Sequence, residues 1–87
     1  MAGKSPCPVK NCTKARNDNQ LMCLHHWRRT PKLLKNAVWD TYLAWGRVVG
    51  AALETKHAAA VAMRDAQRAA IAAVEEKERN ETLRSLL

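Results

Sequence analysis

Three cysteines and a histidine form the pattern in this chain with the clearest chemistry. In the order Cys7-x4-Cys12-x10-Cys23-x2-His26 they supply three thiols and one imidazole. This is the ligand number and type of a closed zinc site, in which four protein ligands leave no position for water. We therefore expect one structural Zn²⁺. His25 is an alternative fourth ligand, but its spacing from Cys23 needs a tighter bend, which favours His26.

Other uses of these cysteines fit the sequence less well. An odd number of cysteines argues against a disulfide framework and for a reducing compartment, so we expect a cytoplasmic protein. Iron–sulfur clusters usually take four thiolates. Three free buried thiols are the remaining alternative to zinc. Because the sequence has no Ser–His–Asp set, Gly-rich phosphate loop or conspicuous carboxylate pair, we do not expect an enzyme.

The positive charge is concentrated near the N-terminus. The net charge is +7, and residues 1–36 contain eight Lys or Arg against one Asp, whereas residues 37–87 are balanced. Such asymmetry suggests a polyanionic partner, with nucleic acid the first choice. The candidate nucleic-acid-binding residues are Arg28, Arg29, Lys32, Lys35, Lys10, Lys14 and Arg16. A solvated basic surface that only aids solubility is the alternative.

The cluster must be positioned by a short N-terminal module within a single domain of 87 residues. Residues 1–30 form this expected zinc module. A turn with two ligands followed by two more at a helix start is similar to a treble clef. Residues 1–6 are expected to be a loose tail, and Asn17-Asp18-Asn19 predicts a turn. Short extended pieces are possible at residues 15–16 and 21–22.

An aromatic-lined helix is expected over residues 31–45. Thr30 would be its N-cap and Pro31 its first residue. An apolar stripe recurs at helical spacing and predicts core positions rather than a ligand platform; its members are Leu34, Val38, Tyr42 and Trp45, with Trp39 and Leu43 beside it.

A second, Ala-rich helix is expected over residues 51–79. Gly46 and Gly50 predict a break before it, and Asn80 predicts its end. The fold class is therefore mainly α, with a helical hairpin or a bent long helix after the zinc module. A weak seam along the second helix could pack on the first helix or form a homodimer; it contains Leu53, Ala60, Met63, Gln67, Ala70 and Val74. No apolar run is long enough for a membrane span.

The spacing of several residues resembles that of a known group of proteins. The pattern Cys7…Cys12…Met22-Cys23…His26-Trp27…Pro31…Val38-Trp39…Tyr42 is similar to small zinc-binding helical proteins of bacteriophages and prophages, which have no assigned activity. The likeness covers residues 7–45, and Arg68–Val74 is similar to their second helix. It implies a zinc-binding helical protein in a bacterial cytoplasm, with only the metal ligands carried over.

Two hypotheses for function follow. The first is nucleic-acid binding through the basic zinc end, with a regulatory role. The alternative is an accessory protein that binds and modulates a host protein through its helical surface. The charge asymmetry favours the first, whereas the absence of an evident base-reading helix favours the second.

Overall fold

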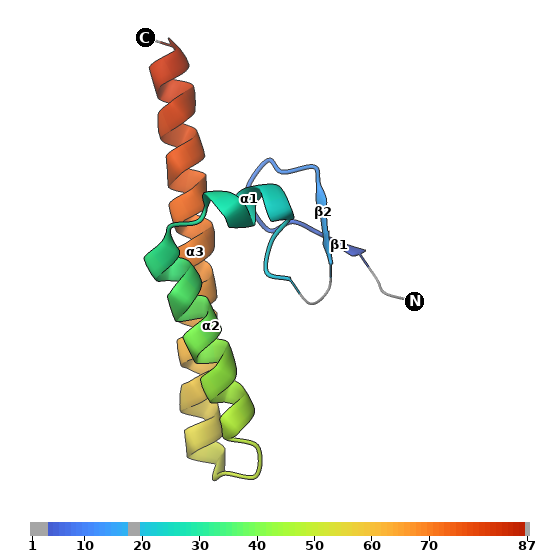
Figure 1. The fold of residues 1–87 in the computed structure, drawn as a ribbon, viewed down its shortest axis with the longest axis vertical. Helices are drawn as coiled ribbons and strands as arrows, with labels where there is room; N and C mark the ends of the chain where they lie inside the picture. The colour runs from blue at the N-terminus through green and yellow to red at the C-terminus, as the bar shows by residue number, and fades with distance from the viewer. Residues whose placement is uncertain (1–3, 18–19, 87) are drawn as a thin grey trace. The chain divides into compact units, whose positions relative to one another are not determined.

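The computed structural model of the protein describes residues 4–17 and 20–86 and is mainly helical, as the sequence predicts. The elements follow in the order β1 (Lys4–Pro6), β2 (Ala15–Asn17), α1 (Leu24–Arg29), α2 (Lys32–Arg47) and α3 (Leu53–Leu86) (Figure 1). They make two compact units. The first contains the described residues up to Thr30 and those from Ile71 onward, and the second contains Pro31–Ala70. Within the described ranges, no helix combines the length and apolar character needed to cross a bilayer.

The first unit begins with a short antiparallel pair of strands. Lys4 pairs with Asn17, Ser5 with Arg16 and Pro6 with Ala15. The expectation of a loose tail is therefore wrong for residues 4–6, and residues 1–3 lie outside the described part of the chain. Of the two extended pieces considered, residues 15–16 lie in β2, whereas residues 21–22 form a bend and belong to no strand. Strands of three residues are too short to show a periodicity that would reveal such a long-range pairing.

Helix α1 is a short helix that ends at Arg29, just before Pro31. Thr30 is not the N-cap of the next helix and Pro31 is not its first residue, because Pro31 is itself the N-cap and α2 begins at Lys32. The Thr30 hydroxyl instead donates to the His26 carbonyl at 3.0 Å and contacts Met22 Sδ at 3.5 Å. Thr30 is buried and completes the end of α1, so a residue with a helix-starting signature serves the preceding helix.

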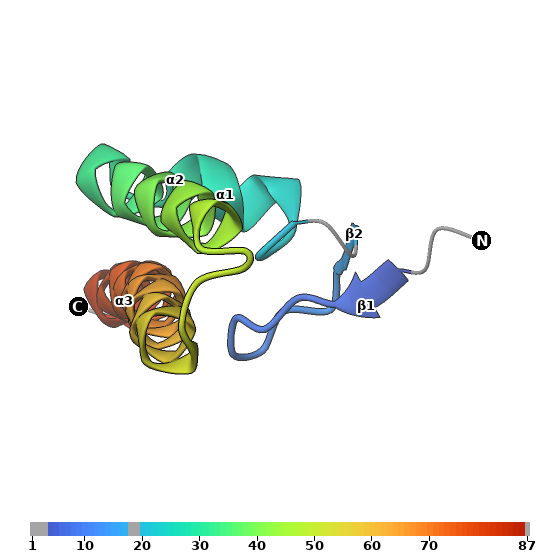
Figure 2. The same cartoon turned by 90° about the horizontal axis from the view of Figure 1, so that it is seen from below.

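In the second unit, α2 and the first part of α3 form a helical hairpin, the first of the two arrangements that the sequence left open (Figures 1 and 2). Helix α2 ends at Arg47. The connection contains Gly50 at φ +86°, a conformation that L side chains rarely adopt, and the Ala51 N–H donates to the Val48 carbonyl at 3.0 Å. The break predicted around the two glycines is thus a turn between antiparallel helices.

Helix α3 continues past Asn80 to Leu86, so the predicted end at residue 79 is wrong. Asn costs a helix interior well under about 1 kcal/mol relative to Ala, which the helix on either side can offset. The hydroxyls of Thr82 and Ser85 donate to the carbonyls of Glu78 and Glu81, at 3.0 and 3.1 Å, and so remain compatible with the helix.

The aromatic residues of α2 are more exposed than a core role requires. Trp39 is 56% exposed and Tyr42 55%, and Trp45 retains 38%, whereas Val38 is buried. The prediction that these aromatic residues form the core is wrong for Trp39, Tyr42 and Trp45. Within the hairpin, α2 packs against the alanine-rich first part of α3. Because alanine side chains are small, they cover only a narrow strip of α2. The predicted seam of α3 is largely covered, from half-buried Ala60 to buried Ala70. Leu53 at its start is the exception and is 82% exposed.

Candidate metal centre

Each of the four cluster residues comes from a short segment with a defined backbone conformation. Cys7 and Cys12 lie on the turn between β1 and β2, where the Cys12 N–H donates to the Val9 carbonyl at 3.1 Å. Asn11 has φ 66°, which allows this turn to reverse tightly. Cys23 is the N-cap of α1, and His26 lies in the first turn of that helix. Their side chains therefore come from a tight turn and a helix start.

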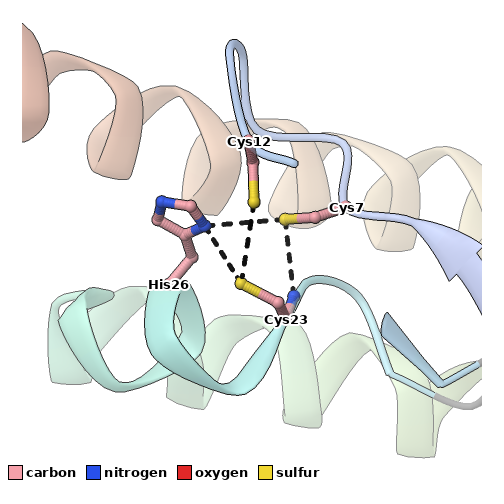
Figure 3. A group of neighbouring side chains, drawn as sticks. All are labelled: Cys7, Cys12, Cys23 and His26. Atoms are coloured by element: carbon pink, nitrogen blue, oxygen red, sulfur yellow. Dashed lines mark hydrogen bonds between the residues drawn. The ribbon is translucent and has the colours of Figure 1, made fainter. Parts of the chain in front are cut away.

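The four ligand atoms converge on one point. The three Sγ atoms and an imidazole nitrogen lie within 4.8 Å of one another. Sγ of Cys7 is 3.6 Å and Sγ of Cys23 3.1 Å from Nδ1 of His26, and Sγ of Cys12 is 3.9 Å from Sγ of Cys23. Figure 3 shows the four side chains pointing toward one another. Tetrahedral Zn–S bonds of about 2.3 Å place sulfurs about 3.8 Å apart. The cluster is therefore close enough to hold a metal ion, and its spacing fits zinc.

Backbone N–H groups are directed at two of the sulfurs. The Cys23 N–H donates to Sγ of Cys7 and the Lys14 N–H to Sγ of Cys12, each at 3.4 Å. Such bonds stabilise a thiolate, the form of cysteine that binds metals. They also connect the two ligand segments directly, because Cys23 of the helix start bonds to Cys7 of the turn.

The cysteines differ in how readily they ionise. For Cys7, burial raises the pKa, but hydrogen bonds from Cys23, Val9 and His26 outweigh it and bring the pKa down from 9.0 to about 7. For Cys12, burial and the neighbouring Cys7 and Cys23 raise the pKa, although the Lys14 backbone N–H lowers it. The two thiols share one site, so the ionisation of one opposes that of the other.

The structure brings His26, not His25, into the cluster. His26 is buried and presents Nδ1 to the sulfurs, while His25 is exposed with its ring edge-on to that of His26, at a centroid distance of 5.1 Å. Helical geometry explains the choice. Positions 23 and 26 lie on one face of a helical turn, whereas position 25 points away from it.

A row of glutamates on the C-terminal part of α3 contacts the module, and sequence reasoning missed it. Nε2 of His26 pairs with Glu78, and Arg29 pairs with Glu81. The Lys10 N–H donates to Glu75 Oε2 at 2.7 Å. Glu75, Glu78 and Glu81 recur every third residue, which places them along one side of the helix. That spacing could have indicated a contact surface on the helix, but from the sequence alone three such glutamates predict a solvent-exposed helix face.

The candidate nucleic-acid-binding residues divide into two groups. In the first unit, Lys10, Lys14 and Arg28 are exposed. Arg29 is half-buried in its pair with Glu81, and Arg16 donates to the backbone carbonyl of Gln20 at 2.7 Å.

Lys32 and Lys35 belong to α2 in the second unit, where Lys32 is exposed and Lys35 is half-buried.

An open depression in the surface of the first unit lies beside the metal cluster. It is lined by Lys14, Ala15, Cys23, Leu24, His25, Arg28 and Arg29.

The fold and the cluster define a small, mainly helical protein with a Cys₃His group able to hold a metal ion. Comparison with models of protein families, with curated proteins and with solved structures gives no match. The similarity to phage proteins and to a treble clef therefore stays a prediction.

Proposed function

We propose that the protein is a structural zinc protein that binds the phosphate backbone of nucleic acid through its zinc module. One Zn²⁺ held by Cys7, Cys12, Cys23 and His26 would fix the module, in a treble-clef-like arrangement. Three thiolates and an imidazole suit zinc, because soft sulfur ligands in a tetrahedral set select it over hard cations. With four protein ligands the metal has no open position, so its role is to stabilise the fold.

The observation that carries nucleic-acid binding is the basic depression beside the cluster. Lys14 and Arg28 are exposed on it, and the exposed imidazole of His25 adds a hydrogen-bonding group. A phosphate seated there would meet two cations held on a turn and a helix that the metal connects. Contacts of this kind position the backbone and do not read base sequence, so weak sequence preference is expected.

The charge of the metal site itself must be included. A Zn²⁺ with three thiolates and a neutral imidazole carries one negative charge. Residues 1–30 contain six Lys or Arg and one Asp, so the loaded module keeps a net charge of about +4. Attraction for phosphates therefore survives metal binding, although part of the basic character serves to offset the thiolates.

The test is a binding titration of the zinc-loaded protein with duplex and single-stranded oligonucleotides at two or more salt concentrations. Lys14→Glu with Arg28→Glu should reduce affinity and lower the log–log salt slope by about 1.8 on duplex DNA, because two phosphate contacts are lost. Arg64→Glu with Arg68→Glu is the matched control, since both arginines are exposed on α3 and the change in net charge is equal. Equal losses in the two double variants would show that net charge alone attracts the nucleic acid.

Arg29 is a poor choice for this experiment. Its reversal to Glu would place a carboxylate against Glu81 and disturb the contact between the module and α3. Any loss of nucleic-acid binding would then be confounded with a change in the fold.

A second candidate function is supported by the exposed aromatic surface of α2. Trp39 and Tyr42 contact each other edge to face, with centroids 6.1 Å apart and planes at 88°, and Leu43 beside them is 50% exposed. Exposed Trp and Tyr are typical anchors of protein interfaces. This surface would serve an accessory protein that binds and modulates a host protein. If so, Trp39→Ala should abolish capture of a partner while leaving nucleic-acid binding unchanged, whereas Leu33→Ala, at a position 82% exposed on the same helix, should not.

A further inference from the structure

The imidazole of His26 has a polar partner on each of its two nitrogens. Nδ1 faces the sulfurs of Cys7 and Cys23, at 3.6 and 3.1 Å. Nε2 pairs with Oε1 of Glu78, on the part of α3 that belongs to the same compact unit. The His26 side chain is only 6% exposed and the contacting Glu78 oxygen is buried. The ring therefore lies between the cluster and a carboxylate from a residue 52 positions later in the chain.

We infer that Glu78 is a positioning residue of the metal centre and that it links metal binding to docking of the C-terminal part of α3. This inference rests on the metal-binding part of the proposed function. A nitrogen that binds a metal cannot carry a proton, so a metal at Nδ1 requires the neutral ring to keep its hydrogen on Nε2. Oε1 of Glu78, which pairs with Nε2, is the carboxylate oxygen closest to that hydrogen and the one available to accept it. The carboxylate then selects the tautomer, holds the ring plane and makes Nδ1 a stronger donor to the metal.

The same contact acts on the helix. Glu78 lies between Glu75, which accepts the N–H of Lys10 on the ligand turn, and Glu81, which pairs with Arg29 of α1. Val74, one turn before Glu78, is fully buried. Both segments that carry ligands are thus attached to one side of α3. Because binding free energies are reciprocal, a metal that orders these segments favours docking of the helix, and a docked helix favours the metal.

A simpler explanation is that Glu78 is one more ion pair that attaches a helix, with no influence on the metal. The two explanations differ in what Glu78 does to metal affinity and to the Nε2 hydrogen. Glu76 provides the control, because it is an exposed carboxylate on the same helix two residues away. Removing either Glu changes the net charge equally, so the comparison cancels the general attraction of acidic groups for Zn²⁺.

The experiment measures zinc affinity of the full-length protein by competition with a chromophoric chelator, in the wild type and in Glu78→Ala, Glu78→Gln, Glu76→Ala and Glu76→Gln. Glu78→Ala should bind zinc about 10–100-fold more weakly than the wild type. Glu78→Gln should fall between the two, because its amide oxygen can still accept the Nε2 hydrogen bond. Both Glu76 variants should stay within about twofold, since Glu76 makes no contact with the ligand ring.

Nuclear magnetic resonance of the ¹⁵N-labelled, ¹¹³Cd-substituted protein supplies a second readout. Coupling of cadmium to Nδ1 of His26 is expected, together with an Nε2–H resonance protected from solvent exchange. This protection should be lost in Glu78→Ala and kept in Glu76→Ala. A ring already fixed by the metal alone would keep the protection in both.

Cadmium coupling to Nε2 in place of Nδ1 would overturn the inference, as would equal zinc affinities for Glu78→Ala and Glu76→Ala. In either case zinc binding by the wild type would leave the metal part of the proposed function standing. A wild-type protein that binds no zinc would remove both.

Discussion

Two adjacent histidines allow a matched test of the metal centre. His26 is buried with Nδ1 at the cluster, and His25 is exposed with no sulfur contact among the described residues. We expect His26→Ala to lose zinc at concentrations that saturate the wild type, and His25→Ala to bind like the wild type. The two substitutions remove the same side chain from neighbouring positions of one short helix. They therefore have the same effect on composition and a similar one on helix propensity.

The magnitude follows from the ligand number. Structural zinc in small modules binds with about 10–16 kcal/mol of apparent free energy, so an equal share for each of four ligands is about 2.5–4 kcal/mol. Loss of the imidazole should then weaken zinc binding by about two to three orders of magnitude. Few large side chains could compensate, because Met22 and Val74 are the largest fully buried ones among the described residues. Each contributes about 1.5–3 kcal/mol by burial, less than the metal.

The assay is zinc stoichiometry by elemental analysis, followed by competition titration and thermal unfolding of each variant. Wild-type affinity in His26→Ala together with a loss in His25→Ala would refute the ligand assignment. Unchanged affinity in both variants would show that the three thiolates bind zinc with water as the fourth ligand, and the centre would no longer be closed.

Three further predictions concern the turn, the core and the hairpin. Cys12→Ser should release zinc and expose the Lys14 N–H, now 3.4 Å from Sγ of Cys12, to rapid hydrogen exchange, while amides of α2 keep their protection; retained protection at Lys14 would contradict this. Met22→Ala should lower the free energy of unfolding of the zinc-loaded protein by about 2–5 kcal/mol, because Met22 is 1% exposed. Gly46→Ala should stabilise the protein by about 0.5–1 kcal/mol, since Gly46 lies within helix α2 with open space around an added Cβ. Gly50→Ala should destabilise it by about 1–2 kcal/mol, because φ is +86° there and not because of any clash. Chemical denaturation measures the stability changes of the Met22, Gly46 and Gly50 variants, and effects of the same sign in the two glycine variants would refute the conformational argument.

Local chemistry along the chain was sufficient to predict the cluster and the helical class. Cys23 and His26 are one helical turn apart, and Cys7 and Cys12 bracket a turn with Pro8 and Asn11, so their spacing alone indicates that each pair can share a ligand site. Alanine-rich sequence predicts helix, and Gly50 predicts a turn, because these preferences belong to the residue and its immediate neighbours.

Contacts between distant segments were decided only by the tertiary structure. Two such contacts are the pairing of β1 with β2 and the attachment of Glu75, Glu78 and Glu81 to the module. The exposure of Trp39 likewise depends on what a distant segment leaves uncovered. A glutamate on a helix looks the same whether it faces water or a histidine, since propensity and periodicity register the helix and not its neighbour. The sequence by itself therefore determined the three cysteines and, by spacing, favoured His26 over His25 as the fourth ligand, whereas only the packing of α3 placed Glu78 against the His26 ring.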